Sequence, residues 1–224
     1  MRGDKLLMLN NSIDYVINHW SLLMTLTLEH ITITATAILL AITFAVPLGI
    51  LLTRCKKIDG TIMGIVGVLQ TIPSMAMLAL MIPFLGIGFK PAVLALFLYA
   101  LLPIVRNTYT GIKGVTPELV EAARGMGMNP MQILLKIQVP IALPIIVAGI
   151  RTATVICVGT ATIAALIGFG GLGSLIYRGL QQLTTEYIVV GAFFSALLAI
   201  FMDLLLGAVE WLLTPKGMRN RARV

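Results

Sequence analysis

Charged residues are scarce in this chain. Asp, Glu, Lys and Arg account for 11% of its 224 residues, whereas soluble domains average about a quarter. Hydrophobic residues make up 58% of the sequence and the mean hydropathy is +1.00. This balance excludes an ordinary soluble domain and predicts an integral membrane protein built from transmembrane helices.

Cysteine and histidine are also rare, with two residues of each type. Cys55 lies at the end of one apolar run and Cys157 lies inside another, so no disulfide and no metal-binding spacing is indicated. His19 and His30 are too isolated to form a metal site. We expect both histidines to be polar residues at the membrane interface.

Aromatic residues form only 7% of the chain. A quaternary ammonium ligand would be held by aromatic faces. However, the spacing of the aromatic residues in or near the apolar runs is equally typical of helix packing, so it reveals no such cage. The residues concerned are Phe97, Tyr99, Tyr109, Phe193 and Phe194.

Five apolar runs are candidates for membrane spans. Four are long enough to cross about 30 Å at about 1.5 Å per residue. They cover residues 31–52, 62–85, 141–167 and 187–213. The fifth, at residues 92–105, is short, so it can cross only by recruiting flanking residues or by lying inside the bundle. An odd number of spans without an internal repeat favours two such units facing each other across a path.

The distribution of Lys and Arg predicts the orientation, because these residues stay preferentially on the cytoplasmic side. With the N-terminus outside, the cytoplasmic segments hold eleven basic residues and the outer segments hold four. The eleven are Arg54, Lys56, Lys57, Arg106, Lys113, Arg124, Lys136, Lys216, Arg219, Arg221 and Arg223. We therefore predict a multi-pass membrane protein with its N-terminus outside and its C-terminus in the cytoplasm.

A polar segment separates the short apolar run from the run at 141–167. Thr116 and Pro117 are suited to the N-cap and the first position of a helix, and Glu118 suits its positive first turn. Gly125 and Gly127 are predicted to end this helix, and Asn129 followed by Pro130 to begin another. A capped helix-turn-helix between two spans indicates a surface that meets another protein.

The same segment resembles the EAA loop of bacterial ABC-importer permeases. Glu121, Ala122 and Ala123 are followed after three residues by Gly127, and after nine more by the string at 137–140. In that family the loop docks into a cleft of a cytoplasmic ATPase. The resemblance implies a coupling loop at residues 115–138. The alternative is that alanine and glycine only fold the loop compactly. The implied contact residues are Glu118, Glu121, Ala122, Ala123, Gly125 and Gly127.

Further strings at residues 70–74, 85–88 and 98–111 resemble permease subunits of glycine betaine, carnitine and choline importers. This likeness implies an all-α type I ABC-importer permease fold with about five transmembrane helices and a role in osmoprotectant uptake. It implies three partners: a cytoplasmic ATPase dimer, a second permease subunit that is identical or paralogous, and an extracytoplasmic solute-binding protein. ATP and magnesium would be bound by the ATPase, so we expect no catalysis, cofactor or metal in this chain. The alternatives are a methionine- or phosphonate-type permease and an ion-coupled secondary carrier.

Four glycines cluster after the run at 141–167. Gly168, Gly170, Gly171 and Gly173 do not form a phosphate-binding loop, because no Gly-Lys-Ser/Thr follows and the preceding segment is a span, not a strand. They are predicted to end the span and to lead into a short helix that continues to Leu183. A similar loop precedes an outer-gate helix in betaine, methionine and phosphonate importers, so the resemblance implies a gate. A simple turn is the alternative.

Arg151 and Asp203 are the ionisable residues deepest in the spans. Each lies about ten residues, or about 15 Å, from the cytoplasmic end of its span, where an unpaired charge is costly. We predict an ion pair between them. The alternative is that one of the two lines the substrate path.

These predictions divide the chain into three parts. Residues 1–30 form an N-terminal arm, which either lies on the outer interface as an amphipathic helix or packs against the bundle. Residues 31–213 form the transmembrane permease domain, and residues 214–224 form a basic cytoplasmic tail.

Overall fold

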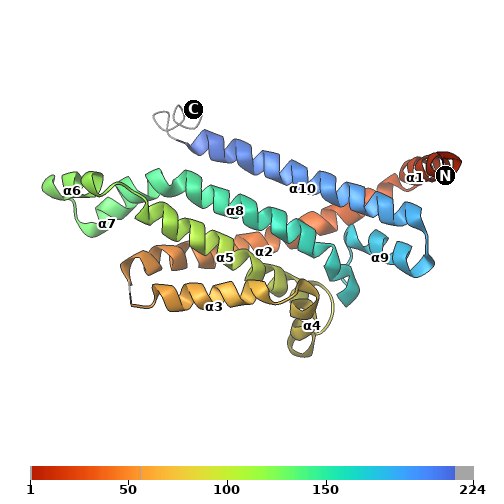
Figure 1. Ribbon diagram of the computed structural model, residues 1–224, viewed down its shortest axis with the longest axis horizontal. Helices are drawn as coiled ribbons and strands as arrows, with labels where there is room; N and C mark the ends of the chain where they lie inside the picture. Colours follow the sequence, from red (N-terminus) through yellow and green to blue (C-terminus); the bar gives the residue numbers. More distant parts are fainter. Residues whose placement is uncertain (1, 56, 215–224) are drawn as a thin grey trace.

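The computed structural model describes residues 2–55 and 57–214, which fold entirely into helices and short connections. Most of the basic tail predicted at 214–224 lies outside these residues. The long helices run side by side in an elongated bundle (Figure 1). Four of them are long and apolar enough to cross a membrane, and a bent pair makes up to five. The four are α2 (Trp20–Arg54), α5 (Phe89–Lys113), α8 (Val139–Ala161) with the turns before it, and α10 (Thr185–Leu213).

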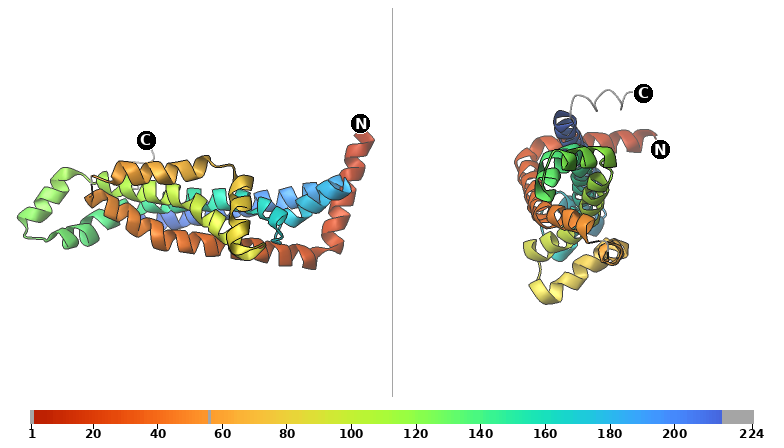
Figure 2. Two further views of the ribbon diagram at one scale, coloured as in Figure 1. Left: turned by 90° about the horizontal axis from the view of Figure 1, so that it is seen from below. Right: turned by 90° about the vertical axis from the view of Figure 1, so that its left-hand side faces the viewer.

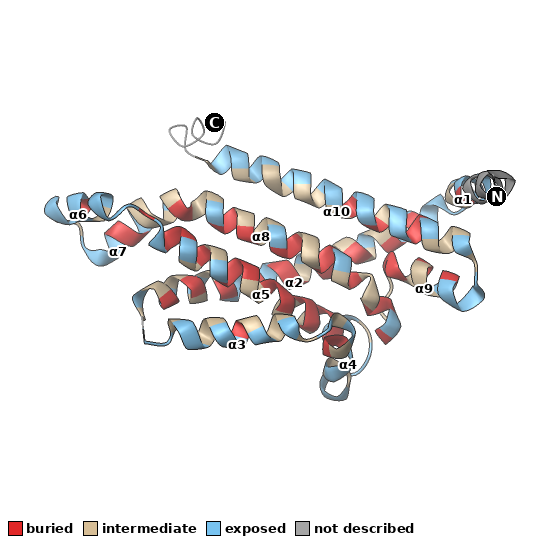
Figure 3. Cartoon of the chain, viewed as in Figure 1, coloured by how far each residue is buried: buried red, intermediate tan, exposed pale blue. Residues whose placement is uncertain are grey.

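Helix α5, the short run of the sequence, occupies the centre of the bundle. It spans 25 residues because it includes the polar residues on either side of its apolar core. The most apolar 18-residue stretch of α5 is 56% buried, whereas that of α10 is 22% buried. Helix α5 packs between α2 and α8 (Figure 3). Both conditions predicted for the short run are therefore met: the helix includes flanking polar residues, and it lies inside the bundle.

Glycines allow the helices around α5 to approach closely, as is typical of membrane bundles. A Cβ atom at Gly149 of α8 would lie 2.6 Å from Cβ of Asn107 and 2.8 Å from the carbonyl oxygen of Pro103. A Cβ atom at Gly49 of α2 would lie 2.7 Å from Cβ of Thr108. The absence of side chains at these two positions sets the spacing of α2 and α8 against α5.

Replacement of Gly149 by alanine should therefore destabilise the bundle by about 1–3 kcal/mol through overpacking. Gly159 is the matched control, because it lies in the same helix and an added Cβ would meet nothing within 4 Å. Gly159→Ala should be neutral or stabilising by up to about 1 kcal/mol. Thermal unfolding in detergent measures both variants, and equal stability of the two would contradict the close-contact explanation.

The run at 62–85 is not one straight span, so this prediction needs correction. It forms α3 (Asp59–Thr71) and α4 (Ser74–Leu85), which meet at an angle of 99°. The cause is Pro73: a proline disfavours helical geometry at the residue before it, and Ile72 is extended with φ −67° and ψ 126°. In Figure 2, α4 turns away from the bundle axis.

Gln70 ties the bent pair to α5. Pro103 lacks the N–H that would pair with the carbonyl of Tyr99 one turn earlier, and the Gln70 side-chain amide donates to that carbonyl at 2.8 Å. The Tyr99 hydroxyl in turn donates to the carbonyl of Ile72 at the bend. Each helix thus supplies a side chain that donates to a carbonyl left without its helical partner in the other: Gln70 to Tyr99 in α5, and Tyr99 to Ile72 at the bend.

The N-terminal arm forms α1 (Arg2–Asn18), which turns away from the long axis at the end of the bundle (Figure 2). The helix break lies at His19. Residues 20–30, predicted as part of the arm, therefore form the first part of α2. The Tyr15 ring packs 4.7 Å from the Tyr187 ring of α10, and Asn11 donates to Glu186 at 3.2 Å. Through these residues the arm contacts α10 of its own bundle.

Candidate functional site

The EAA-like loop, residues 115–138, projects from one end of the bundle (Figure 1). Its first helix, α6 (Pro117–Gly125), begins with Thr116 at the N-cap and Pro117 in the first turn, which confirms the predicted start. The helix ends in a Schellman motif. The N–H of Gly127 donates to the backbone carbonyl of Arg124 at 2.9 Å, and the N–H of Met128 donates to the backbone carbonyl of Ala123 at 3.1 Å. Gly127 has φ +80°, a left-handed conformation that favours glycine.

The second helix of the loop, α7 (Pro130–Ile133), begins as predicted after Asn129. Asn129 and Gln132 form a reciprocal capping box with two hydrogen bonds of 2.9 Å. The chain then passes through a π-helical turn (Leu134–Gln138) into α8. This irregular turn ends two residues before Pro140, which lacks the N–H needed for a regular helix.

The exposed surface of α6 differs from the contact set implied by the sequence. Glu118, Glu121, Ala122 and Gly125 are exposed, whereas Ala123 is 1% exposed. Ala123 therefore packs against the chain itself. At this position the structure favours the alternative, in which the alanine only helps the loop to fold compactly. Sequence analysis missed two large apolar side chains, Leu119 (48% exposed) and Met126 (72% exposed). With Ala122 they fall at spacings of three and four, and so share one face of the helix and its continuation.

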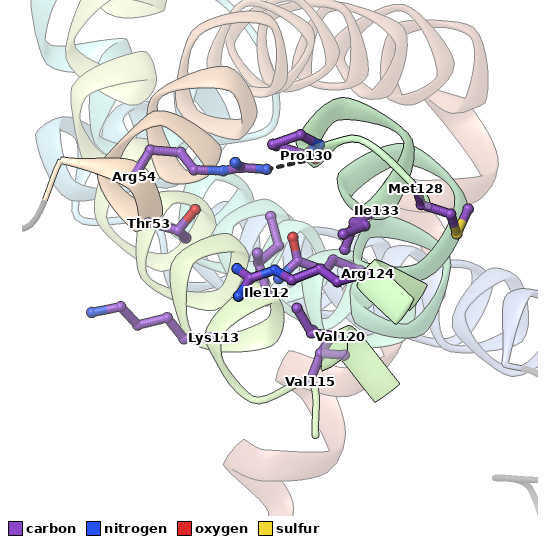
Figure 4. A pocket seen from close by; sticks show the side chains of 11 residues that line it. Thr53, Arg54, Ile112, Lys113, Val115, Val120, Arg124, Met128, Pro130 and Ile133 are labelled. Carbon is purple, nitrogen blue, oxygen red and sulfur yellow. Dashed lines mark hydrogen bonds between the residues drawn. The ribbon is translucent and has the colours of Figure 1, made fainter. Parts of the chain in front are cut away.

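A cavity of about 460 Å³ separates this loop from the ends of α2 and α5 (Figure 4). Three cationic side chains line it: Arg54, Lys113 and Arg124. Arg54 closes one side, because its guanidinium donates to the carbonyl oxygen of Pro130 at 3.0 Å. This bond joins the last turn of α2 to the first turn of α7 and fixes the loop on the bundle.

A second anchor lies beside this cavity. The Tyr109 hydroxyl donates to the Asp59 carboxylate at 2.5 Å, and the Lys113 ammonium lies 3.5 Å from the same carboxylate. Tyr109, one of the aromatic residues considered from the sequence, therefore holds the start of α3 against the end of α5.

The structure brings Arg151 and Asp203 together between α8 and α10, where their side chains are 34% and 37% exposed. The guanidinium of Arg151 binds both oxygens of Asp203, at 2.5 and 2.6 Å. It also lies 3.4 Å from Glu210, which sequence analysis missed although Glu210 follows Asp203 by two helical turns. Gly207, between the two acids, leaves room for the guanidinium, because a Cβ atom there would lie 3.1 Å from it.

The glycine loop lies at the end of the bundle opposite the EAA-like loop. The helix α8 ends at Ala161, and a 3-10 turn (Ile163–Ile167) leads to Gly168 with φ +76°. The helix α9 (Gly173–Gln182) follows and is capped by Leu183, as predicted. Gly173 packs directly against the backbone of Thr162, and the carbonyl of Ile167 accepts a 2.9 Å bond from Gly88.

Two neighbouring residues of α2, Glu29 and His30, lie against this loop, a contact that sequence analysis did not find. The N–H of Gly171 donates to the Glu29 carboxylate at 2.8 Å. His30 is 0% exposed, and its Nε2 donates to the carbonyl of Val158 at 3.0 Å. The prediction that His30 is an interfacial polar residue is therefore wrong.

Among the described residues, no three His, Cys, Asp or Glu side chains lie close enough together to hold a metal ion. Cys55 and Cys157 are both free thiols.

The sequence pattern of the family described as "Binding-protein-dependent transport system inner membrane component" matches residues 45–213. The chain belongs to this family. It is thus a multi-pass inner-membrane permease of the ABC-importer class, and an importer of this kind works with an ATPase and a binding protein. The match spans all the long helices except the first part of α2.

Two similar proteins from Bacillus subtilis (strain 168) are permeases of named transport systems. This permease is 51% identical to the "Choline transport system permease protein OpuBB" over 194 residues, covering 87% of this chain and 89% of that protein. It is 48% identical to the "Glycine betaine/carnitine/choline transport system permease protein OpuCB", covering 88% and 90%. The resemblance to osmoprotectant permeases noted from the sequence is therefore confirmed at the level of the family.

A solved structure supports the fold. The permease superimposes on a chain of the MetNI methionine ABC transporter, described as inward facing, with a TM-score of 0.80 over 88% of this chain and 99% of that one. The identity is 24%, so this likeness shows the fold alone. The type I ABC-importer permease fold predicted from the sequence is confirmed.

Proposed function

We propose that this chain is the permease subunit of an ATP-driven importer for small osmoprotectants of the quaternary ammonium class, such as choline, glycine betaine or carnitine. The observation that carries the proposal is the 51% identity to a choline-system permease across nearly the whole chain. The substrate class comes from such relatives, because a fold alone does not determine a substrate.

The EAA-like loop is the surface that docks on the ATPase. Leu119, Ala122 and Met126 form its apolar contact face, and the two exposed glutamates flank this face. ATP and magnesium belong to the ATPase, and this chain takes no part in hydrolysis. A loop that is capped at both helix starts and tied to α2 through Arg54 is stiff enough to pass a displacement to the spans.

Two copies, or this chain and a paralogue, enclose the translocation path between them. The described helices α10 and α3 carry broad exposed apolar faces, which need lipid or a second permease to cover them. In this arrangement the EAA-like loop and the C-terminus face the cytoplasm. The glycine loop faces the outside, where a separate binding protein delivers the solute.

Reconstitution tests this proposal. The permease, its ATPase and its binding protein are purified together and placed in proteoliposomes, and uptake of labelled choline is measured with competing glycine betaine, carnitine and methionine. We expect uptake that requires ATP and is inhibited by the quaternary ammonium solutes but not by methionine. Inhibition by methionine alone would support a methionine-type importer, and ATP-independent uptake down an ion gradient would support a secondary carrier.

A further inference from the structure

A cavity of about 330 Å³ lies at the end of the bundle opposite the EAA-like loop, between α2, the start of α5 and the glycine loop. Small-molecule sites range from about 300 to 1,000 Å³, so it suits a small solute. Six residues line it: Thr25, Leu28, Glu29, Thr32, Phe89 and Phe169.

The Glu29 carboxylate gives this cavity a negative charge. One of its oxygens accepts the N–H of Gly171 at 2.8 Å, which fixes the side chain. Within residues 10–55 and 57–214, no Lys or Arg forms a salt bridge with it. Because a half-buried carboxylate without a cationic partner attracts positive charge at close range, the site favours a cation.

Phe89 and Phe169 supply the aromatic part of the site. They come from segments 80 residues apart, yet their ring centroids lie 5.8 Å apart with the planes inclined at 49°. Aromatic faces together with a carboxylate attract quaternary ammonium groups, which offer positive charge without hydrogen-bond donors.

The face of α2 that lines this cavity carries a polar stripe. Its members follow at spacings of three and four residues and so lie on one side of the helix. Thr25, Thr32 and Thr36 donate their hydroxyl hydrogens to carbonyls one turn earlier, so the lone pairs of the hydroxyl oxygens remain available to a solute. The row runs from the cavity toward the middle of the bundle and comprises Ser21, Thr25, Glu29, Thr32 and Thr36.

We infer that Glu29, Phe89 and Phe169 form a binding site for the quaternary ammonium group of a cationic solute at the entrance to the translocation path. The substrate class rests on the proposed function. The geometry of the site depends on the glycine loop: a Cβ atom at Gly170 would overlap the Glu29 carboxylate, and Gly171 with φ +75° presents the N–H that fixes it. Movement of the loop would therefore separate Phe169 from Glu29 and release the cation.

Equilibrium dialysis tests this site on the purified complex of permease and ATPase without the binding protein. The probes are choline and its neutral isostere 3,3-dimethylbutan-1-ol. Glu29→Gln keeps an oxygen for the Gly171 N–H but removes the charge, so choline affinity should fall about tenfold while binding of the neutral isostere is unchanged. Replacing both Phe89 and Phe169 by leucine should weaken choline binding only about two- to fivefold, because Phe89 is exposed and Phe169 is half-buried.

Glu186→Gln is the matched control, because Glu186 lies at the same end of the bundle and is already engaged by Asn11. It should bind choline like the wild type. Equal choline affinity in wild type and Glu29→Gln, or no preference of the wild type for choline over the isostere, would overturn the site.

ATP-driven uptake by the wild-type complex with its binding protein separates this inference from the proposed function. If the wild type imports quaternary ammonium solutes but choline binding is independent of Glu29, the site is wrong and the proposed function stands. If the wild type imports none of these solutes, the proposed function itself fails.

Discussion

Ala122→Trp should reduce ATP-driven uptake about 100-fold, which corresponds to about 2.7 kcal/mol of lost docking free energy. Ala122 is exposed at the centre of the α6 face between Leu119 and Met126. An indole at this position clashes with a docked ATPase but with nothing in the described part of the permease itself. We therefore expect normal insertion and continued ATP hydrolysis by the ATPase, without transport, in proteoliposomes.

Lys57→Trp is the control for this variant. Lys57 is exposed in the turn between α2 and α3, at the same end of the bundle but outside the EAA-like loop and outside the apolar face of α3, so its uptake should remain near that of the wild type. Wild-type uptake by Ala122→Trp would show that this face does not meet the ATPase. Equal loss in both variants would mean that any bulky group at this end interferes.

The local structure of the loop could be predicted from the sequence, because its signals are short-range. A proline at the first helical position, a glycine with positive φ and an asparagine cap each act within about four residues. Which alanine faces outward could not be predicted in the same way. Ala122 and Ala123 are chemically identical, and only the packing of α6 over the cavity decides that Ala123 is the buried one.

The broken helix shows a second limit. The run at 62–85 is apolar throughout, so hydropathy indicates one span, and Pro73 alone does not distinguish a kink from a sharp bend. The bend is stabilised by contacts between the run and α5. The Gln70 side chain donates to the carbonyl of Tyr99, and the Tyr99 hydroxyl donates to the carbonyl of Ile72. Such contacts depend on the tertiary arrangement of α3 against α5.

The candidate cation site could not be found from the sequence for the same reason. Glu29 and Gly171 are 142 residues apart, and neither Phe89 nor Phe169 belongs to a recognisable aromatic motif. Arg151 and Asp203 were an easier case. Few ionisable residues lie deep in the spans, and their similar depth together with the cost of burying charge was enough to pair them.

Neutralising Asp203 should give the largest loss of folded protein of any single change in the spans. Asp203→Asn removes the acid that binds Arg151 through two short bonds and leaves the guanidinium with Glu210 alone at 3.4 Å. Both side chains are about one third exposed in this chain, but they lie within membrane-spanning helices, where an uncompensated charge is costly. We therefore expect about a tenth of the wild-type yield of folded permease. Size-exclusion chromatography in detergent measures this yield.

Glu210→Gln serves as the graded control, because it removes only the single longer contact and should retain most of the wild-type yield. The exchange Arg151→Asp with Asp203→Arg restores the pair in reverse order and should recover much of what either single variant loses. Adding Glu210→Gln to the exchange removes a like charge facing the new Asp at position 151, so recovery should rise further. If the exchanged protein is no better than the single variants, the contact is not what holds α8 against α10, and a role of Arg151 in the substrate path would then account for the loss.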